Sequence, residues 1–349
     1  MNEKELYDVT IIGGGPAGLY SAFYSGLRAM KTKLIEYQPR LGGKIHVYPE
    51  KMIWDVGGLT PVSGEKLIEQ LVAQGLTFDP TVALNEKVVK ITRNDEDHFV
   101  LHTAAGLKHY SRTVIVAVGG GILKPQKLEI DGAEKYEVAN LHYTVKSLNQ
   151  FKDKTVIISG GGNAAVDWAN ELIPFAKQVY LSYRKDSLKG HEAQVEQLKN
   201  GPAQCYFHTS ITKLAASDSK EKIKSVELTN HLTGEVTELS IDEVIINHGY
   251  ERDTELLKNC SMDIKKRDNY FIEGTPSSES SVDGLFAAGD ILKYDGKVHL
   301  IAGAFQDAAN AVNRAKQYIE PEAQEYGMVS SHNEIFKQRN KTLINQMVQ

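Results

Sequence analysis

Ten residues near the start of the chain determine its architecture: Val9-Thr10-Ile11-Ile12-Gly13-Gly14-Gly15-Pro16-Ala17-Gly18. The apolar run predicts a buried strand, the glycines predict a tight turn, and the segment that follows Gly18 predicts a helix. In such a unit Gly13 permits the turn, Gly15 lets a pyrophosphate approach the backbone, and Gly18 lets helix and strand pack closely. The free N–H groups and the dipole at the helix N-terminus favour the negative phosphates. The stretch therefore predicts a dinucleotide-binding turn.

A carboxylate follows at the place that such a turn requires. The run Lys33-Leu34-Ile35 predicts the second strand, and it ends in Glu36, 23 residues after Gly13. An acid at the end of this strand accepts hydrogen bonds from the ribose hydroxyls of a bound nucleotide. Glycine triplets also occur in ordinary turns, so the prediction depends on the whole order of strand, turn, helix, strand and acid.

The same pattern recurs 147 residues later. Thr155–Ser159 predicts a strand, and a second turn follows with Gly160, Gly162 and, at the third position, Ala165. After the next predicted strand, residues 178–183, the chain carries three cations where the first unit has Glu36: Arg184, Lys185 and Lys189. Cations at this place pair with the 2′-phosphate of NADPH, which an acid would repel. The alternative interpretation of these cations is a solvated basic loop.

Length and composition restrict the class of protein. The 349 residues suggest roughly two domains, and the net charge of −5 without a basic block argues against nucleic acid as a partner. No apolar run approaches the ~20 residues that span a bilayer, and the charged segment Met1–Glu5 does not resemble a signal peptide. Cys205 and Cys260 lie far apart, without C-x-x-C or metal-ligand spacing, which favours a reducing, cytoplasmic setting and no metal site.

The remaining patterns complete an α/β fold with two Rossmann-like dinucleotide-binding domains. Ser63–Gln74 predicts an amphipathic helix with Ser63 as its N-cap, and residues 88–91 and 98–102 alternate as antiparallel strands do. A returning strand ends at Gly119, and Lys124-Pro125 predicts a crossing between domains. Asp290 follows another strand, and a small-residue helix and a polar tail complete the chain. The expected domains are 1–120 with 284–349, and 121–283.

Taken together, these motifs resemble the flavoproteins with two dinucleotide-binding domains, and most closely the thioredoxin-reductase-like ferredoxin/flavodoxin–NADP+ reductases (ferredoxin–NADP reductase type 2). The specific marks cover the whole chain: Leu41-Gly42-Gly43-Lys44, Tyr48-Pro49-Glu50-Lys51, Asp55-Val56, Lys124-Pro125, His142-Tyr143, Gly289-Asp290 and the extension beyond Pro321. True thioredoxin reductases need a C-x-x-C dithiol in the second domain, which this sequence lacks. The resemblance implies three-layer ββα domains, with a discontinuous FAD domain first and an NADPH domain second.

The resemblance also implies residue roles. It places Glu36 on the adenosine ribose of FAD, Lys44 near the flavin, Val88 at the adenine, and Asp290 on the ribityl chain; Tyr48 stacks on one flavin face with Leu123 beside it. In the family the C-terminal extension of one subunit of a homodimer covers the other face with an aromatic residue or histidine. Here that position is Val329, and Ser331 follows it near the flavin. Valine cannot stack as an imidazole would, and His332 would need a shift of register.

The implied reaction is hydride transfer from NADPH to FAD, followed by single-electron transfer to ferredoxin or flavodoxin. No side-chain acid or base is required for hydride delivery, so no catalytic residue is assigned. Residues 120–124 and 275–284 are the expected hinges, and two basic groups are candidate docking surfaces: Arg28/Lys31/Lys33 and Lys337/Arg339/Lys341. Two other functions remain open, a reductase or oxidase of a small disulfide, quinone or ferric chelate, and a cofactor-sensing interaction protein. His248 is interpreted as structural.

Overall fold

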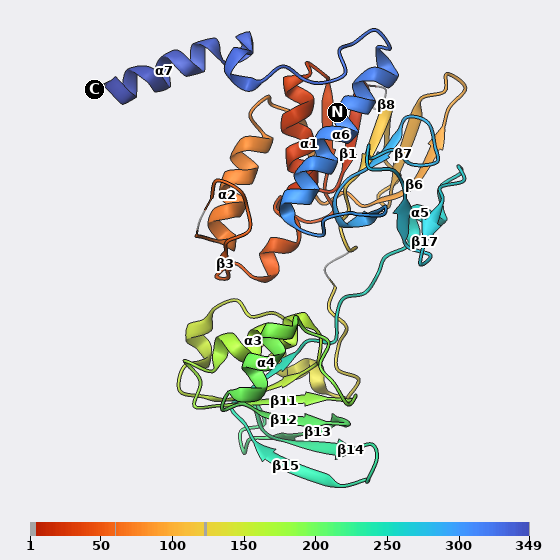
Figure 1. The fold of residues 1–349 in the computed structure, drawn as a ribbon. Helices are drawn as coiled ribbons and strands as arrows, with labels where there is room; N and C mark the ends of the chain where they lie inside the picture. Colours follow the sequence, from red (N-terminus) through yellow and green to blue (C-terminus); the bar gives the residue numbers. More distant parts are fainter. Residues whose placement is uncertain (1–4, 60, 122–123, 349) are drawn as a thin grey trace. The chain divides into compact units, whose positions relative to one another are not determined.

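A computed structural model describes residues 5–59, 61–121 and 124–348. The chain divides into two compact units (Figure 1). The first consists of Met1–His46, Lys51–Ile122 and Arg252–Gln349, and the second of Val47–Glu50 and Leu123–Glu251. The first glycine turn lies in the first unit and the second turn in the second unit.

The first unit is built on a sheet with the order β5-β2-β1-β8-β7-β6, and β19 pairs with β8. Strands β1, β2, β5, β8 and β19 are parallel, whereas β6, β7 and the first half of β8 form an antiparallel meander. The strands are β1 Leu6–Ile12, β2 Thr32–Ile35, β5 Thr81–Ala83, β6 Val88–Arg93, β7 Phe99–Thr103, β8 Lys108–Val116 and β19 Leu285–Ala287. Three helices belong to this unit's core, α1 Pro16–Leu27, α2 Gly64–Gly75 and α6 Ile301–Ile319, and α1 packs on β1 and β2 and against the other two.

Shorter elements complete the first unit. They are η1 Gly43–Val47, β3 Met52–Ile53, β4 Val62–Ser63, α5 Glu255–Lys258, β17 Lys266–Arg267, β18 Phe271–Glu273, η4 Gly289–Ile291, β20 Leu292–Lys293, η5 Ser330–His332, η6 Glu334–Phe336 and α7 Lys337–Val348. The expected N-cap of α2 is confirmed, because the Ser63 hydroxyl accepts the Lys66 N–H at 3.3 Å. The polar tail is not structureless, since it ends in the twelve-residue helix α7.

The return to the first unit occurs at Arg252, 32 residues before the expected boundary at Gly284. The reason is packing. Leu256, Leu257, Ile264, Tyr270 and Ile272 lie in the apolar cluster of the first unit, together with buried residues of the meander such as Ile91 and Phe99. The expected hinge at residues 275–284 therefore lies inside the first unit. The two crossing segments instead meet beside each other, where Pro125 pairs with Tyr250 and the Glu251 N–H donates to the Lys124 carbonyl at 2.8 Å.

The second unit repeats the three-layer plan. Its parallel sheet has the order β12-β11-β10-β16-β9, and a separate antiparallel sheet has the order β13-β14-β15. Its elements are η2 Ala133–Tyr136, β9 Leu141–His142, η3 Leu148–Phe151, β10 Thr155–Ser159, α3 Asn163–Leu172, β11 Gln178–Tyr183, α4 Glu192–Asn200, β12 Gln204–Phe207, β13 Thr209–Ala216, β14 Ile223–Asn230, β15 Val236–Ser240 and β16 Glu243–Ile246.

Strand β10 shows why this unit has two cores. Val156 and Ile158 pack in a cluster with residues of α3 and α4, whereas Ile157 packs in a cluster with β13 and β14 residues. Successive side chains of a strand point to opposite faces, so a fully apolar strand requires a layer on each side. No helix in the described part of the chain is long and apolar enough to cross a membrane.

Candidate functional site

The first glycine turn leaves no room for larger residues at two of its positions. Gly13 has a φ of +109°, and a Cβ there would lie 2.4 Å from the Ala117 carbonyl oxygen at the end of β8. A Cβ on Gly18 would lie 1.8 Å from the Gly13 carbonyl oxygen. Helix α1 can therefore begin directly against the end of β1, which is the close packing that the sequence pattern predicts.

The N-terminus of α1 is open to an anion. Gly15 is its N-cap, Pro16 is its first residue, and the first turn carries neither a side-chain cap nor an acid. A helix start leaves N–H groups without intrahelical partners, and such groups bind phosphates. A Cβ on Gly15 would have only the Gly43 Cα within 4 Å, at 3.6 Å.

Glu36 is held beside this turn. The side chain is buried, at 8% exposure, and its carboxylate accepts the Gly14 N–H at 2.5 Å and the Gln38 N–H at 2.7 Å. A carboxylate has four lone-pair sites, so both oxygens can still accept ribose hydroxyls. The Glu86 N–H donates to the Glu36 carbonyl at 3.0 Å, and this pairing brings Val88 at the start of β6 close to the same strand end. These residues fit the adenosine half of a dinucleotide.

The loop that follows β2 closes over the turn. The Gly42 N–H donates to the Gly14 carbonyl at 2.8 Å. A Cβ on Gly43 would lie 2.7 Å from the Gly15 Cα, so only glycine allows this approach. Lys44 then follows as an exposed residue in η1. The structure thus brings Lys44 next to the turn.

Asp290 reaches the same edge of the sheet although it follows Gly13 by 277 residues in the chain. Strand β19 runs parallel to β8, so both end at the edge that carries the turn. A Cβ on Gly289 would lie 3.0 Å from the Ala17 Cβ and 3.8 Å from the Ala304 Cβ, so the first turns of α1 and α6 meet at Gly289. Asp290 is exposed beside them.

Four of the expected flavin neighbours are not among the residues at this turn in the described part of the first unit. Tyr48 lies in the second unit, where its half-buried ring packs against the apolar cluster of α3 and β10. Leu123 lies outside the described residues. Val329 and Ser331 are exposed in the tail, between Gly327, which contacts Tyr24 and Arg28, and Asn333, whose side-chain amide donates to the Leu27 carbonyl. They therefore lie at the C-terminal end of α1, opposite its glycine turn.

The second turn is built like the first, but it leaves more room around its third glycine, Gly162. A Cβ on Gly160 would lie 2.5 Å from the Asn247 carbonyl oxygen, and a Cβ on Gly161 would lie 2.3 Å from the ring of Tyr183. A Cβ on Gly162 would meet nothing within 4 Å. Helix α3 starts after Gly162 without a side-chain cap or an acid in its first turn, and Ala165 is fully buried against the sheet. Gly162 is therefore the position at which a pyrophosphate can reach the backbone.

The three cations lie at this second turn. Arg184, Lys185 and Lys189 are all exposed, and the Lys189 N–H donates to the Gly161 carbonyl at 2.7 Å. Within the described residues no carboxylate forms an ion pair with any of them. The adjacent Asp186 carboxylate instead accepts the Ser187 hydroxyl at 3.0 Å. The positive charge is therefore available to a ligand.

His248, which the sequence predicts to be structural, lies beside the second turn. It follows β16, and its Nε2 lies 2.9 Å from the Ser159 hydroxyl at the end of β10, directly before the second turn. Burial and the positive charge of Arg184 lower the pKa of His248, so the imidazole is neutral at pH 7. Its place directly after a buried parallel strand is the signal that could have identified it.

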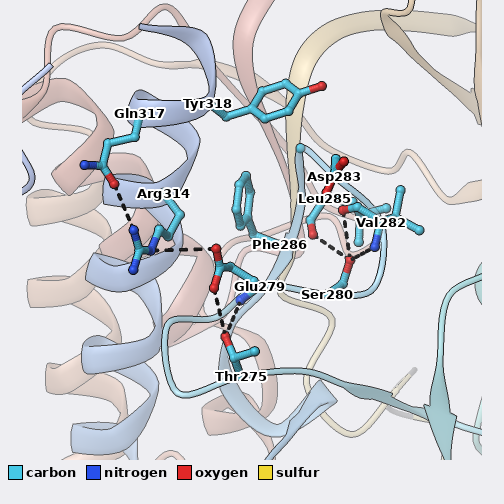
Figure 2. Close-up of a pocket in the computed structure, with 11 residues that line it drawn as sticks. Thr275, Glu279, Ser280, Val282, Asp283, Leu285, Phe286, Arg314, Gln317 and Tyr318 are labelled. Atoms are coloured by element: carbon cyan, nitrogen blue, oxygen red, sulfur yellow. Dashed lines mark hydrogen bonds and ion pairs between the residues drawn. The ribbon is translucent and has the colours of Figure 1, made fainter. Parts of the chain in front are cut away.

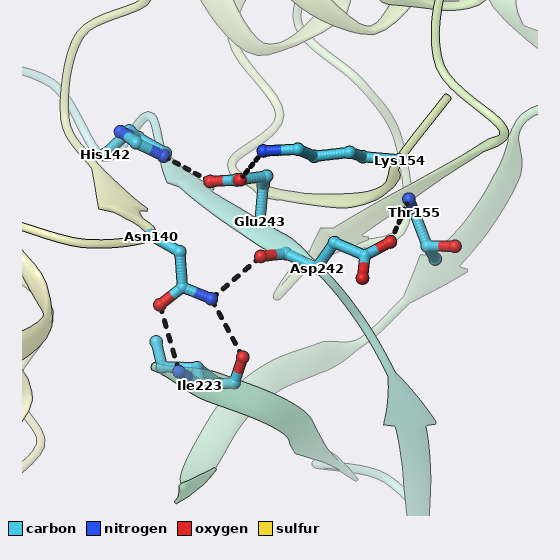
Figure 3. A network of polar contacts seen from close by, with 7 residues as sticks. All are labelled: Asn140, His142, Lys154, Thr155, Ile223, Asp242 and Glu243. Carbon is cyan, nitrogen blue, oxygen red and sulfur yellow. Dashed lines mark hydrogen bonds and ion pairs between the residues drawn. The ribbon is translucent and has the colours of Figure 1, made fainter. Parts of the chain in front are cut away.

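Two other polar features each lie away from the glycine turn of their own unit. Glu243 is buried at the start of β16, where it accepts from His142 at 2.6 Å and from Lys154 (Figure 3). Burial alone would raise the pKa of Glu243, but these two hydrogen bonds lower it. The start of β16 is the edge of the sheet opposite the second turn, so this network is structural.

A cavity of about 420 Å³ lies in the first unit, between the loop before β19 and the last turns of α6 (Figure 2). Arg314 is one of the residues that line it, 3.8 Å from Glu279 and 3.1 Å from the Gln317 side chain. The cavity lies at the start of β19, whereas Asp290 follows the end of that strand. It is therefore separate from the glycine turn.

Comparison with known proteins agrees with this geometry. The family model described as pyridine nucleotide-disulphide oxidoreductase matches residues 7–315. The chain is 72% identical to ferredoxin–NADP reductase 1 of Bacillus mycoides over 348 residues, covering 100% of both chains. It is 69% identical to ferredoxin–NADP reductase 2 of Exiguobacterium sibiricum, covering 100% of this chain and 99% of the relative. Among solved structures, thioredoxin reductase of Lactococcus lactis superposes with a TM-score of 0.74 at 27% identity, covering 90% of this chain and 99% of that one.

Proposed function

Because the chain belongs to the pyridine nucleotide-disulphide oxidoreductase family, and within it to the ferredoxin–NADP reductases, we propose that its first glycine turn binds FAD and its second binds NADPH. The enzyme transfers electrons between NADPH and ferredoxin through FAD. When bound, FAD supplies the exchange between the two-electron chemistry of NADPH and the one-electron chemistry of ferredoxin. The protein supplies binding, orientation and charge.

The assignment of the turns depends on one observation: the first turn has a negative side chain beside it, and the second turn has positive side chains. Glu36 accepts from the first turn itself, and a carboxylate there favours a ribose diol and repels a 2′-phosphate. The second turn has Arg184, Lys185 and Lys189 instead, exposed and with no ion pair among the described residues. Guanidinium and ammonium groups form charge-assisted hydrogen bonds with phosphate.

In the first unit, Gly13, Gly15 and Gly18 admit the FAD pyrophosphate to the start of α1. Glu36 binds the adenosine ribose, the Val88 backbone contacts the adenine, and Lys44 and Asp290 lie toward the flavin and its ribityl chain. In the second unit, Gly160, Gly162 and Ala165 form the corresponding cradle for NADPH. The roles of Tyr48 and Leu123 beside the flavin, and of Val329 and Ser331 on its other face, are proposed from the family resemblance alone.

A homodimer would give the tail a role. Val329 and Ser331 lie at the C-terminal end of α1, and a helix of twelve residues is about 18 Å long, so these two residues lie about that far from the glycine turn of their own chain. Beyond it, α7 exposes Leu343, Ile344 and Met347. Exposed apolar residues on a helix favour contact with a second copy of the chain.

Of the two basic groups that the sequence offers as docking surfaces for an acidic carrier, one is not available in the structure. Arg28 and Lys33 are buried, at 8% and 5% exposure, and Lys31 pairs with Glu5 at 2.7 Å. These residues therefore offer no free basic surface. Arg339 and Lys341 of α7 are exposed and, together with Lys337, which pairs with Glu334 at 3.1 Å, remain the proposed contact for ferredoxin; flavodoxin is proposed as a second carrier.

We further propose a cytoplasmic setting, which the two unpaired, half-buried cysteines Cys205 and Cys260 support. Ferredoxin and flavodoxin, tested separately with cytochrome c as the final acceptor, check the function. The expected result is a yellow protein that NADPH bleaches and that reduces cytochrome c far faster when a carrier is added. A protein that reduces small disulfides or quinones rapidly, and is indifferent to both carriers, would refute the carrier assignment.

A further inference from the structure

Asp307 is a fully buried acid of α6 that contacts the segment carrying Asp290. It lies in the second turn of α6 with 0% exposure. Its carboxylate accepts the Gly289 N–H and the Tyr294 hydroxyl, each at 3.0 Å, and forms an ion pair with Lys297. The Lys297 side chain is itself only 2% exposed. Three donors from one loop therefore converge on a single carboxylate.

These contacts tie the segment 289–300 to α6 at three residues. Gly289 precedes Asp290, and Tyr294 and Lys297 lie in the loop that leads into the helix. A Cβ on Gly303 would lie 2.1 Å from the Val298 carbonyl oxygen, so the loop also packs directly on the first turn of α6. Burial and the negative charge of Asp307 raise the pKa of Tyr294 to about 12, so its hydroxyl remains a hydrogen-bond donor.

Stability alone does not explain a buried ion pair at this place. Removing two charges from water offsets most of their attraction, and a well-packed apolar pair is often as stable. The directional contacts do fix one geometry. They join Asp290, the uncapped start of α6 and, through Gly289, the first turn of α1 into one rigid frame.

We propose that Asp307 is a positioning residue for the flavin, acting through Gly289 and Lys297 to hold Asp290 and the first turn of α6 in their binding geometry. The inference rests on the proposed assignment of FAD to the first unit. Asp307 itself does not touch the cofactor. It acts through the groups that it orients, as residues that hold the direct contacts of a ligand commonly do.

The test compares four variants of the full-length protein. Asp307→Asn keeps the shape of the side chain but leaves the Lys297 ammonium buried without its counter-charge, and Lys297→Met removes the cation. The double variant removes both charges together. The control is Asn313→Ala, which breaks another buried polar contact of α6, the 2.6 Å hydrogen bond from Arg28, at a place that holds the tail and not the loop.

The readouts are the FAD dissociation constant of the apoprotein, the visible circular dichroism of the bound flavin and its midpoint potential. We expect Asp307→Asn to weaken FAD binding by about ten-fold or more and to alter the flavin dichroism and potential. The double variant should recover part of the affinity, and Asn313→Ala should lower the melting temperature while leaving the dichroism unchanged.

The outcomes separate the two proposals. Wild-type protein that takes up no FAD would overturn the assignment of the first unit and this inference with it. Wild-type protein that binds FAD, with dichroism and affinity preserved in Asp307→Asn, would overturn the inference alone. If Asp307→Asn does not fold, Lys297→Met and Tyr294→Phe decide the matter in the same way, because a flavin spectrum unchanged in both contradicts a positioning role.

Discussion

Gly162→Ala should separate nucleotide binding from folding in the second unit. Gly162 has φ −88° and ψ −179°, a backbone conformation that any residue adopts, and a Cβ there meets nothing within 4 Å. The methyl group therefore enters open space in the free protein. It occupies the place at which the pyrophosphate of NADPH must approach the backbone.

The magnitudes follow from these two facts. Alanine is a poorer N-cap than glycine, which lowers the stability of the folded protein. Replacing a glycine also reduces the conformational entropy of the unfolded chain, which stabilises the folded protein by about 0.4–1 kcal/mol. Because these effects oppose each other, the free energy of unfolding should change by less than about 1 kcal/mol. If the pyrophosphate loses two charge-assisted hydrogen bonds, each contributing about 1.5–3 kcal/mol, the NADPH affinity falls by roughly 10²- to 10⁴-fold.

The assay is NADPH titration of the FAD-loaded variant, with thermal unfolding measured in parallel. FAD content and chemical reduction of the flavin by dithionite should remain as in the wild type, because the first turn is untouched. The matched control is Gly161→Ala, whose Cβ would lie 2.3 Å from the Tyr183 ring and should lower the melting temperature. An unchanged NADPH dissociation constant in Gly162→Ala would refute the assignment of the second turn.

Three further substitutions test the NADPH preference, the contact with the FAD ribose and the ion pairs of Glu243. Replacing Arg184 and Lys185 together by alanine should lower the ratio of kcat/KM for NADPH to that for NADH by about ten-fold or more, and an unchanged ratio would remove the 2′-phosphate assignment. Glu36→Gln should weaken FAD binding by about ten-fold, measured by titration of the apoprotein; undiminished affinity would place the adenosine ribose elsewhere. Glu243→Gln should lower the free energy of unfolding by about 1–3 kcal/mol at pH 7. Because the folded-state pKa of Glu243 is lowered, the carboxylate stabilises the protein above the ordinary carboxyl pKa, and this stabilisation is lost as pH falls through the folded-state value. Urea unfolding of wild type and variant at several pH values checks this. A difference in the free energy of unfolding that does not change with pH would contradict the ion-pair explanation.

The two cofactor turns were predictable from the sequence because their requirements are local. Gly18 is needed because a Cβ there would meet the Gly13 carbonyl oxygen five residues earlier, and Glu36 follows its strand directly. Steric exclusion and strand-to-helix order act over about thirty residues, so they leave a readable pattern. Whole-chain similarity to ferredoxin–NADP reductases confirms the family that this pattern indicated.

What only the tertiary structure decided depends on packing between residues far apart in the chain. Segment 252–283 lies with the first unit because its apolar side chains complete the core of β6 and β7. Arg28 and Lys33, which a charge pattern presents as a basic surface, are buried by partners 285 and 76 residues away. Asp307 is one acid among many in the sequence, and it becomes the anchor of the loop that carries Asp290 only when folding removes it from water. Burial and convergence are properties of the assembled core, so no local pattern could have specified them.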